Sequence, residues 1–264
     1  MIESYLIESY LMKSSPIKKL ITTVLLPSIL LIACSAPREE STAPQRPSDF
    51  PTSTYANPDP QSNLYKIDSA NSIVRIKVLR GGAMAKFGHD HIVASRDVQG
   101  YLLLGDDNSC RADFYASLNQ LIVDDPVLRN QAKLLTTPSE KDIADTKTNM
   151  LISLQAEEFP FVQLQSLDCA DAMKGQQIAT SISLHGVTQE QQLGMTVGQA
   201  DTNSVESNSL EPNRSSLLIN GSFAILQTDF GIEPFSVFNG LLKVEDRLEI
   251  SYRLVAHKRE LDQD

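Results

Sequence analysis

LEISYRLVA, residues 248–256, alternates apolar and polar side chains along almost its whole length. Its apolar members lie two positions apart, and the residues between them include Glu249, Ser251 and Arg253. A period of two is typical of a β-strand that packs one face on a core and turns the other to solvent. We therefore predict a half-buried strand here, and the rest of the chain is interpreted outward from it.

The same period recurs along the chain between turns rich in Gly, Asn and Asp. The clearest further runs are Ile73–Val78, Ala112–Leu118, Ile178–Leu184, Leu193–Val197 and Leu217–Ile225. At least seven or eight half-buried strands are indicated, which suits antiparallel closure better than a small sandwich. The predicted fold class is all-β: an extended antiparallel barrel of about eight strands.

Two segments break this pattern. Residues 124–158 form a helix-friendly connection that Pro126 and Pro138 divide, so one or two short helices are expected there. Gly198–Ser216 is polar and rich in Asn and Ser, which predicts a long surface loop.

The N-terminal region is typical of a bacterial lipoprotein precursor. An apolar run from Leu20 to Ala33 follows three lysines and is shorter than the roughly 20 residues that span a bilayer. It ends in Leu31-Ile32-Ala33-Cys34, a lipobox-like pattern, so we expect residues 1–33 to be removed and Cys34 to carry lipid. A plain signal peptide that contains a cysteine is the alternative. The repeated IESYL before Met12 favours Met12 as the true start.

The segment after the predicted lipid anchor contains six prolines between Cys34 and Ser62 and no apolar period. We interpret residues 34–62 as a tether, 63–258 as one folded domain and 259–264 as a polar tail. Ser35 follows Cys34, whereas an Asp at this position would resemble an inner-membrane retention signal. The expected location is therefore the outer membrane, facing the periplasm.

The charge of the chain argues against a nucleic-acid partner. The formal net charge is −10, and removal of residues 1–33 brings it to −11, because they contain three Lys and two Glu. Such a surface repels phosphate backbones and gains nothing from counterion release.

Two cysteines remain once Cys34 is assigned to lipid. Cys110 opens one predicted strand and Cys169 closes the next long one, so antiparallel pairing of these strands would place the two side by side. In an oxidising compartment we expect a Cys110–Cys169 disulfide. Two buried free thiols are the alternative.

Four short motifs, in order along the chain, resemble the YceI-like family and cover about residues 63–258. They are Tyr65-Lys66-Ile67-Asp68 with Asn71-Ser72-Ile73, Phe159-Pro160-Phe161-Val162, Leu184-His185-Gly186-Val187-Thr188 and Thr228-Asp229-Phe230-Gly231-Ile232. The resemblance implies a lipocalin-like barrel whose interior holds a long apolar chain, such as an isoprenoid or quinone tail or a fatty amide. The alternation of residues by itself fits a packed interior equally well.

We take six phenylalanines as candidates for lining or gating such an interior: Phe87, Phe114, Phe223, Phe230, Phe235 and Phe238. No cofactor is required, although a bound isoprenoid lipid or quinone is expected in the barrel. The expected partners are this lipid and the membrane, and a second copy of the chain stays open as a homodimer partner.

The segment Gly88-His89-Asp90-His91 resembles a run in a lipoprotein subtype of the family, and it leaves three interpretations open. In an extended backbone His89 and His91 point to one face, a spacing suited to two metal ligands, with His185 as a third. The imidazoles would otherwise bond backbone carbonyls at a turn, or contact the head group of a lipid.

Enzymatic chemistry finds little support. The sequence contains no Gly-x-Ser-x-Gly, no glycine-rich phosphate loop and no cysteine left for nucleophilic work. Adjacent carboxylates such as Asp124 and Asp125 are interpreted as solvated caps in turns. The sequence thus predicts a non-enzymatic, membrane-tethered periplasmic lipid-binding protein; a metal-binding or redox-associated stress protein using His89 and His91 is the alternative.

Overall fold

The structure is a computed structural model that describes residues 46–107, 109–199 and 215–259. The predicted signal, Cys34, most of the predicted 198–216 loop and nearly all of the C-terminal tail lie outside these residues. The described residues all belong to one compact unit. None of the described helices has the length and apolar composition needed to cross a bilayer.

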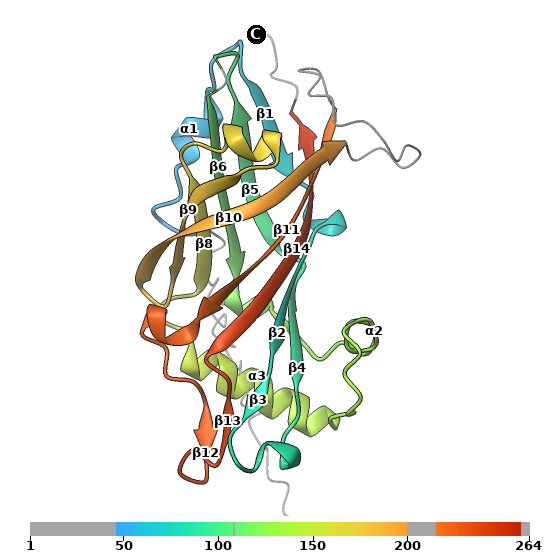
Figure 1. Cartoon of the computed structure of the whole chain (residues 1–264). Helices are drawn as coiled ribbons and strands as arrows, with labels where there is room; N and C mark the ends of the chain where they lie inside the picture. The colour runs from blue at the N-terminus through green and yellow to red at the C-terminus, as the bar shows by residue number, and fades with distance from the viewer. Residues whose placement is uncertain (1–45, 108, 200–214, 260–264) are drawn as a thin grey trace, which may run out of the picture. The chain divides into compact units, whose positions relative to one another are not determined.

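Strands dominate the described chain (Figure 1). They are β1 Asn63–Ile67, β2 Ile73–Val78, β3 Arg80–Gly81, β4 His91–Ser95, β5 Val98–Leu104, β6 Cys110–Ser117, β7 Ile122–Val123, β8 Phe161–Ser166, β9 Gln177–Leu184, β10 Val187–Gln199, β11 Ser216–Leu226, β12 Ser236–Val237, β13 Leu242–Val244 and β14 Arg247–Lys258. The α-helices are α1 Thr52–Ala56, α2 Pro126–Gln131 and α3 Glu140–Ser153, and 3-10 turns are η1 Ser69–Asn71, η2 Ala85–Phe87, η3 Leu118–Gln120, η4 Ala170–Lys174 and η5 Gln227–Phe230.

Eight strands close into an antiparallel barrel in the order β1, β5, β6, β8, β9, β10, β11, β14, after which β14 returns to β1. This confirms the predicted fold class. The outermost residues of the predicted 198–216 loop belong to β10 and β11, because alternating side chains extend both strands beyond the apolar runs.

Strand β14 pairs with β11 along one edge and with two strands, β1 and β2, along the other. This second edge distinguishes the two ends of the barrel. The last residues of β14 pair with β1, Ala256 opposite Ile67, and its first half pairs with β2, Ile250 opposite Ile76. From β2 the sheet continues through β4 to β7. We call the end at β1 and η4 the upper end and the end at α3 the lower end, as in Figure 1.

One or two short helices were expected between residues 124 and 158; two are present, and local signals start both. Asp125 accepts hydrogen bonds from the first backbone amides of α2, and Pro126 occupies its first turn. Ser139 and Asp142 form a reciprocal capping box at the start of α3, which then lies beside β7.

The predicted tether is too long at its C-terminal side. Residues 46–62 lie against the outside of the barrel, where Phe50 and Tyr55 are buried with Leu64 and Tyr115. The Tyr55 hydroxyl donates to the buried Asp113 carboxylate, and burial raises the pKa of Tyr55. The prolines of this segment favoured its interpretation as a tether. Two well-spaced aromatic side chains are nevertheless enough to hold a short segment against the barrel.

The barrel interior contains two apolar clusters. The upper cluster includes Tyr65, Leu102 and Leu217 around the disulfide, and the lower cluster includes Ile182 and Phe230. Gly100 of β5 has φ +142°, and a Cβ there would lie 2.1 Å from a backbone oxygen of β6, so glycine is required for these two strands to approach.

A separate small sheet lies below the barrel, formed by β3, β13 and β12 in that order (Figure 1). Its strands come from two segments far apart in the sequence, residues 79–88 and 235–244. The amide of Met84 in the first segment donates to the carbonyl of Leu241 in the second, which joins the two loops.

Candidate functional site

The barrel encloses a cavity of about 350 Å³ whose wall is almost entirely apolar. Both interior clusters contribute to this wall, so the cavity runs between the two ends of the barrel. Small inward side chains leave the space: Ala112, Ala116 and Thr180 lie on the wall where larger residues would fill the interior. The volume falls within the range of small-molecule sites.

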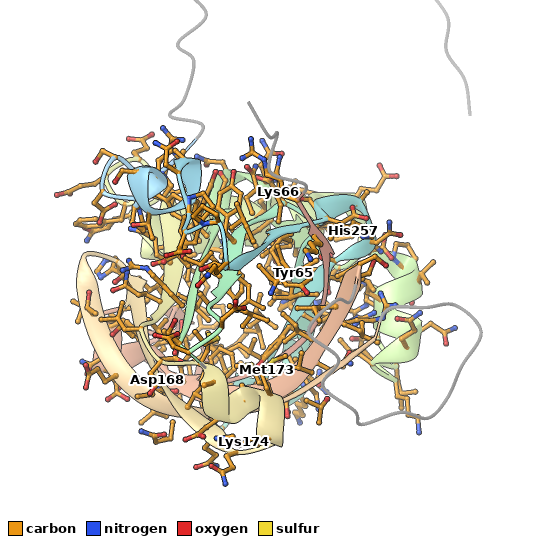
Figure 2. The ribbon with its side chains drawn as sticks, turned by 90° about the horizontal axis from the view of Figure 1, so that it is seen from above. Tyr65, Lys66, Asp168, Met173, Lys174 and His257 are labelled. Atoms are coloured by element: carbon orange, nitrogen blue, oxygen red, sulfur yellow. A yellow bond between two sulfur atoms is a disulfide. The ribbon has the colours of Figure 1, made fainter. Side chains whose placement is uncertain are left out.

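The upper end of the cavity is held by a covalent link. Cys110 at the start of β6 and Cys169 after β8 form the expected disulfide, and the Cys169 amide donates to the Cys110 carbonyl at 3.2 Å. Met173 of the following 3-10 turn lies on the cavity wall, whereas its neighbour Lys174 lies at the rim, as the view from above shows (Figure 2).

The lower end of the cavity meets a polar stripe on α3. Thr146, Asn149, Met150 and Ser153 follow the spacing of one helix face, and all four lie on the cavity wall. Three of these four side chains carry hydrogen-bonding groups, so this end presents several polar groups on one element, whereas the upper wall carries isolated hydroxyls such as that of Tyr252.

A buried network positions His91 at this polar end. The His91 Nδ1 lies 2.5 Å from Oδ2 of Asp124, and the other Asp124 oxygen accepts from Arg129 and from the amide of Ile92. Arg129 also donates to the carbonyls of Asp90 and Thr136. His91 belongs to the cavity wall, so the network aims one imidazole at the interior.

The Asp124 carboxylate is stabilised in its charged form. Burial raises its pKa, but the hydrogen bonds from His91 and the Ile92 amide outweigh burial, and the pKa lies below the ordinary value. Asp124 also has φ +55°, a conformation that costs about 1–3 kcal/mol in a residue other than glycine. Its three hydrogen bonds offset this strain.

Two hydroxyls on the cavity wall are buried without a hydrogen-bond partner, those of Thr180 and Tyr252. Burial raises the pKa of Tyr252 to about 12. Its hydroxyl occupies the place where a side chain at Gly221 would stand, so the absence of a Cβ at Gly221 admits the ring.

The sequence matches the model of the YceI-like domain over residues 65–256. The chain belongs to the YceI-like family. Comparison with curated proteins finds no match.

Solved structures with the same kind of fold are distant from this YceI-like chain. A polyisoprenoid-binding domain from Saccharophagus degradans, implicated in plant cell wall breakdown, is 12% identical with a TM-score of 0.47; the match covers 74% of this chain and 98% of that one. BcnA of Burkholderia cenocepacia is 13% identical, with a TM-score of 0.45 and coverage of 72% and 98%. A YceI protein of Campylobacter jejuni is 10% identical, with a TM-score of 0.38 and coverage of 62% and 82%.

The candidate residues of this YceI-like domain separate into three groups. His91, Phe114, Phe223 and Phe235 lie on the cavity wall. Phe230 is fully buried in the lower cluster beside the cavity rather than on its wall. Phe87 and Phe238, predicted to line or gate the interior, are instead largely exposed below the barrel, because both belong to the small lower sheet and its turns.

The three histidines do not form the alternative metal site. Among the described residues of this YceI-like domain, no group of three or more His, Cys, Asp or Glu side chains is placed to hold a metal ion. His91 is hydrogen-bonded to Asp124, and the centroids of the His89 and His91 rings are 6.3 Å apart. His185 has φ +53° in the tight β9–β10 turn and its Nδ1 lies 3.0 Å from the Phe230 carbonyl, so it closes a turn.

Sequence reasoning missed two parts of this site. Asp125 is the helix cap that was predicted, but its neighbour Asp124 is buried and not a solvated cap, because the chain turns inward beneath β4. The polar stripe of α3 is readable in the spacing of Thr146, Asn149 and Ser153. On a helix that spacing is equally typical of a face turned to solvent, so only the cavity distinguishes it.

Proposed function

We propose that this YceI-like protein is a membrane-tethered periplasmic binding protein for a lipid with one long apolar tail and one polar end. The observation that carries the proposal is the apolar cavity inside the closed barrel. Each buried methylene contributes about 0.8 kcal/mol, so a tail of isoprenoid, quinone or fatty-amide type binds without any polar contact along its length.

The asymmetry of the cavity supports one orientation of the ligand. The tail extends toward the disulfide at the upper end, and the polar group lies below, near His91 and the stripe of α3. His91, with its Nδ1 held by Asp124, presents its second ring nitrogen to the polar group of the ligand. In the neutral imidazole this nitrogen accepts a hydrogen bond from a hydroxyl, and in the protonated imidazole it donates one to a carbonyl or phosphate oxygen. A binding role without catalysis accords with the family.

The tether is supported by the lipobox-like Leu31-Ile32-Ala33-Cys34 at the end of the signal, and the absence of Asp after Cys34 favours the outer membrane. Mass spectrometry of the protein isolated from membranes tests this part. A diacylated N-terminal Cys34 is expected; an N-terminus elsewhere contradicts it.

The binding proposal is tested by organic extraction of natively purified protein followed by mass spectrometry. We expect a stoichiometric amphiphile with a long apolar tail. The variant Ala112→Phe fills the wall within the cavity and should lose the ligand, whereas Ala179→Phe, on the exposed face of β9, should keep it. A wild-type extract without lipid, together with no binding of added isoprenoid lipids, contradicts the proposal.

The orientation is tested with His91→Ala. Loss of one hydrogen bond of about 0.5–1.5 kcal/mol should weaken binding of a polar-ended lipid roughly 2–10-fold and leave a hydrocarbon of equal tail length unaffected. Equal weakening of both ligands places the polar end elsewhere.

A further inference from the structure

The small sheet below the barrel exposes an unusual share of large apolar side chains. We define the lower tip as residues 79–88 and 235–244, which contain β3, η2, β12 and β13. Four of its large apolar residues have high exposed fractions: Phe87 64%, Phe238 66%, Leu241 47% and Phe235 41%. Apolar residues gathered at one end, instead of scattered singly, mark an interaction surface.

The charged residues in the two segments of the lower tip are all basic, and the acidic residues that border them are Asp90 and Glu245. The two segments contain Arg80, Lys86 and Lys243, whereas the chain has a net charge of −10. Arg80 is paired with Asp90, and the ammonium of Lys86 lies 4.9 Å above the Phe87 ring. Aromatic side chains with flanking lysines are the composition that binds the interface of an anionic bilayer.

The upper end has a different character. Seen from above, Lys66, Asp168, Lys174 and His257 lie around the rim (Figure 2). Lys174 pairs with Asp171, and His257 with Asp68. A rim of charged groups of both signs stays in water, so the two ends of the barrel are suited to different surroundings.

The turn that presents Phe238 is strained. Phe238 and Asn239 have φ +52° and +56°, and Gly240 follows at +83°. A bulky residue in the left-handed region is rare, and the cost of about 1–3 kcal/mol is typical of sites where the geometry is used. Here the strained turn carries an aromatic ring that is two-thirds exposed.

The lower tip is continuous with the cavity, and the predicted anchor leaves the domain room to turn. Phe235 and Val244 belong both to the tip and to the cavity wall. The described chain begins close to β8, where Asp49 accepts from the Gln163 amide at 3.2 Å. The twelve residue steps from Cys34 to Arg46 span up to about 40 Å, so the predicted anchor does not hold the barrel directly against the bilayer.

We propose that the lower tip docks into the surface of a phospholipid bilayer, with Phe87, Phe238 and Leu241 inserted among the lipids and Lys86 and Lys243 at the headgroups. The lower end of the cavity, whose wall includes Phe235 and Val244, then lies where a lipid leaves the membrane. Membrane docking does not depend on the proposed function, whereas the transfer of a ligand through the lower end of the cavity rests on the proposed function.

The chain contains no Trp, so a single introduced Trp is a unique fluorescent reporter. We compare Phe238→Trp at the tip with Leu167→Trp, which is 66% exposed at the upper end beside Asp168. Each full-length variant is reconstituted in phosphatidylcholine–phosphatidylglycerol vesicles with and without brominated acyl chains. We expect a blue shift and strong bromine quenching at position 238 and neither at position 167.

Equal quenching at both positions, or quenching at neither, overturns the docking proposal. A blue shift of the Phe238→Trp emission without vesicles, together with a dimer in analytical ultracentrifugation, replaces the bilayer with a second copy of the chain as the occupant.

Transfer is tested with a Phe87→Ser/Phe238→Ser variant. Each lost aromatic should weaken bilayer partitioning roughly tenfold or more, and uptake of a fluorescent isoprenoid from vesicles should slow accordingly. Binding of the same isoprenoid from detergent should stay unchanged. Normal uptake from vesicles overturns the transfer route, whereas failure of the wild type to bind from detergent contradicts the proposed function instead.

Discussion

The upper and lower ends of the barrel are stabilised by different means. At the upper end the ring closes through backbone pairing of β1 with β14, and a disulfide links Cys110 to Cys169. At the lower end β2, β4 and β7 continue the wall, α3 lies beside it, and a buried carboxylate joins the elements. The upper end is therefore closed by bonds that hold without any side-chain network, and the lower end depends on one.

This difference bears on how the cavity opens. Local opening follows the element with the weakest support, and a helix packed by half-buried side chains separates more readily than a hydrogen-bonded strand. In α3 the described residues are all half-buried or exposed. Under the proposed function, the end closed by α3 is the one where the lipid passes, and the covalently closed end is where its tail rests.

The largest effect is expected from Asp124→Ala. The change leaves the Arg129 guanidinium buried without its carboxylate, which should lower the free energy of unfolding by about 3–5 kcal/mol. Urea unfolding of the variant measures this. Asp125→Ala, the adjacent helix cap, is the matched control and should cost about 1 kcal/mol. Equal costs for the two would show that the lower end does not depend on the network.

The upper end is broken by Cys110→Ala/Cys169→Ala. Loss of the cross-link across 59 positions should lower the free energy of unfolding by about 2–4 kcal/mol. Reductant should destabilise the wild type by the same amount in urea and leave the double variant unchanged. If reductant shifts neither protein, the disulfide contributes nothing to the rigidity of the upper end.

Thr180→Val tests the wall between the two ends of the cavity. It replaces a buried, unpartnered hydroxyl by a methyl of similar size. Removing an unsatisfied polar group should raise the free energy of unfolding of the lipid-free protein by about 1 kcal/mol. Thermal unfolding checks this beside Thr196→Val on the exposed face of β10, where no gain is expected. A loss of stability at Thr180 would mean that its hydroxyl has a partner such as water.

The smallest effect concerns acid. The pKa of Asp124 is lowered on folding, so its contribution is complete above the unfolded value near 3.9 and is lost as pH falls through the folded value. The stability of the wild type should therefore decline more steeply below about pH 4 than that of Asp124→Asn. Urea unfolding between about pH 2 and 6 measures both slopes, and parallel slopes would remove Asp124 from the acid response.

The strands that the sequence predicted and those it did not name differ in how regularly apolar and polar residue types alternate. The runs that became β2, β6, β9, β10, β11 and β14 show this alternation in their sequence, whereas β5 ends in three consecutive leucines although its burial alternates. Strand β4 was not named, since four of its five residues are buried and it shows no alternation. Strand β1 has three buried residues of five and is equally short. A period of two can be recognised in a sequence only when one face of the strand is exposed and therefore polar.

The candidate site was predicted in part for a similar reason. His91 was identified by its residue type, but its partner Asp124 comes from a turn 33 positions away, and nothing local distinguishes that carboxylate from its neighbour Asp125. Phe87 and Phe238 were assigned to the interior by apolarity alone. The structure places them outside, where two distant segments form one sheet.

The sequence by itself determined the strand alternation, the antiparallel all-β class, the two short helices and the pairing of Cys110 with Cys169, because each follows from local period or from the position of a residue along neighbouring strands. Only the tertiary structure decided which strands close the ring, which end of the cavity carries the polar stripe, and which aromatic side chains lie on the cavity wall or on the outer surface. These depend on side chains that closure of the sheet brings together across long stretches of chain, and no local pattern carries that information.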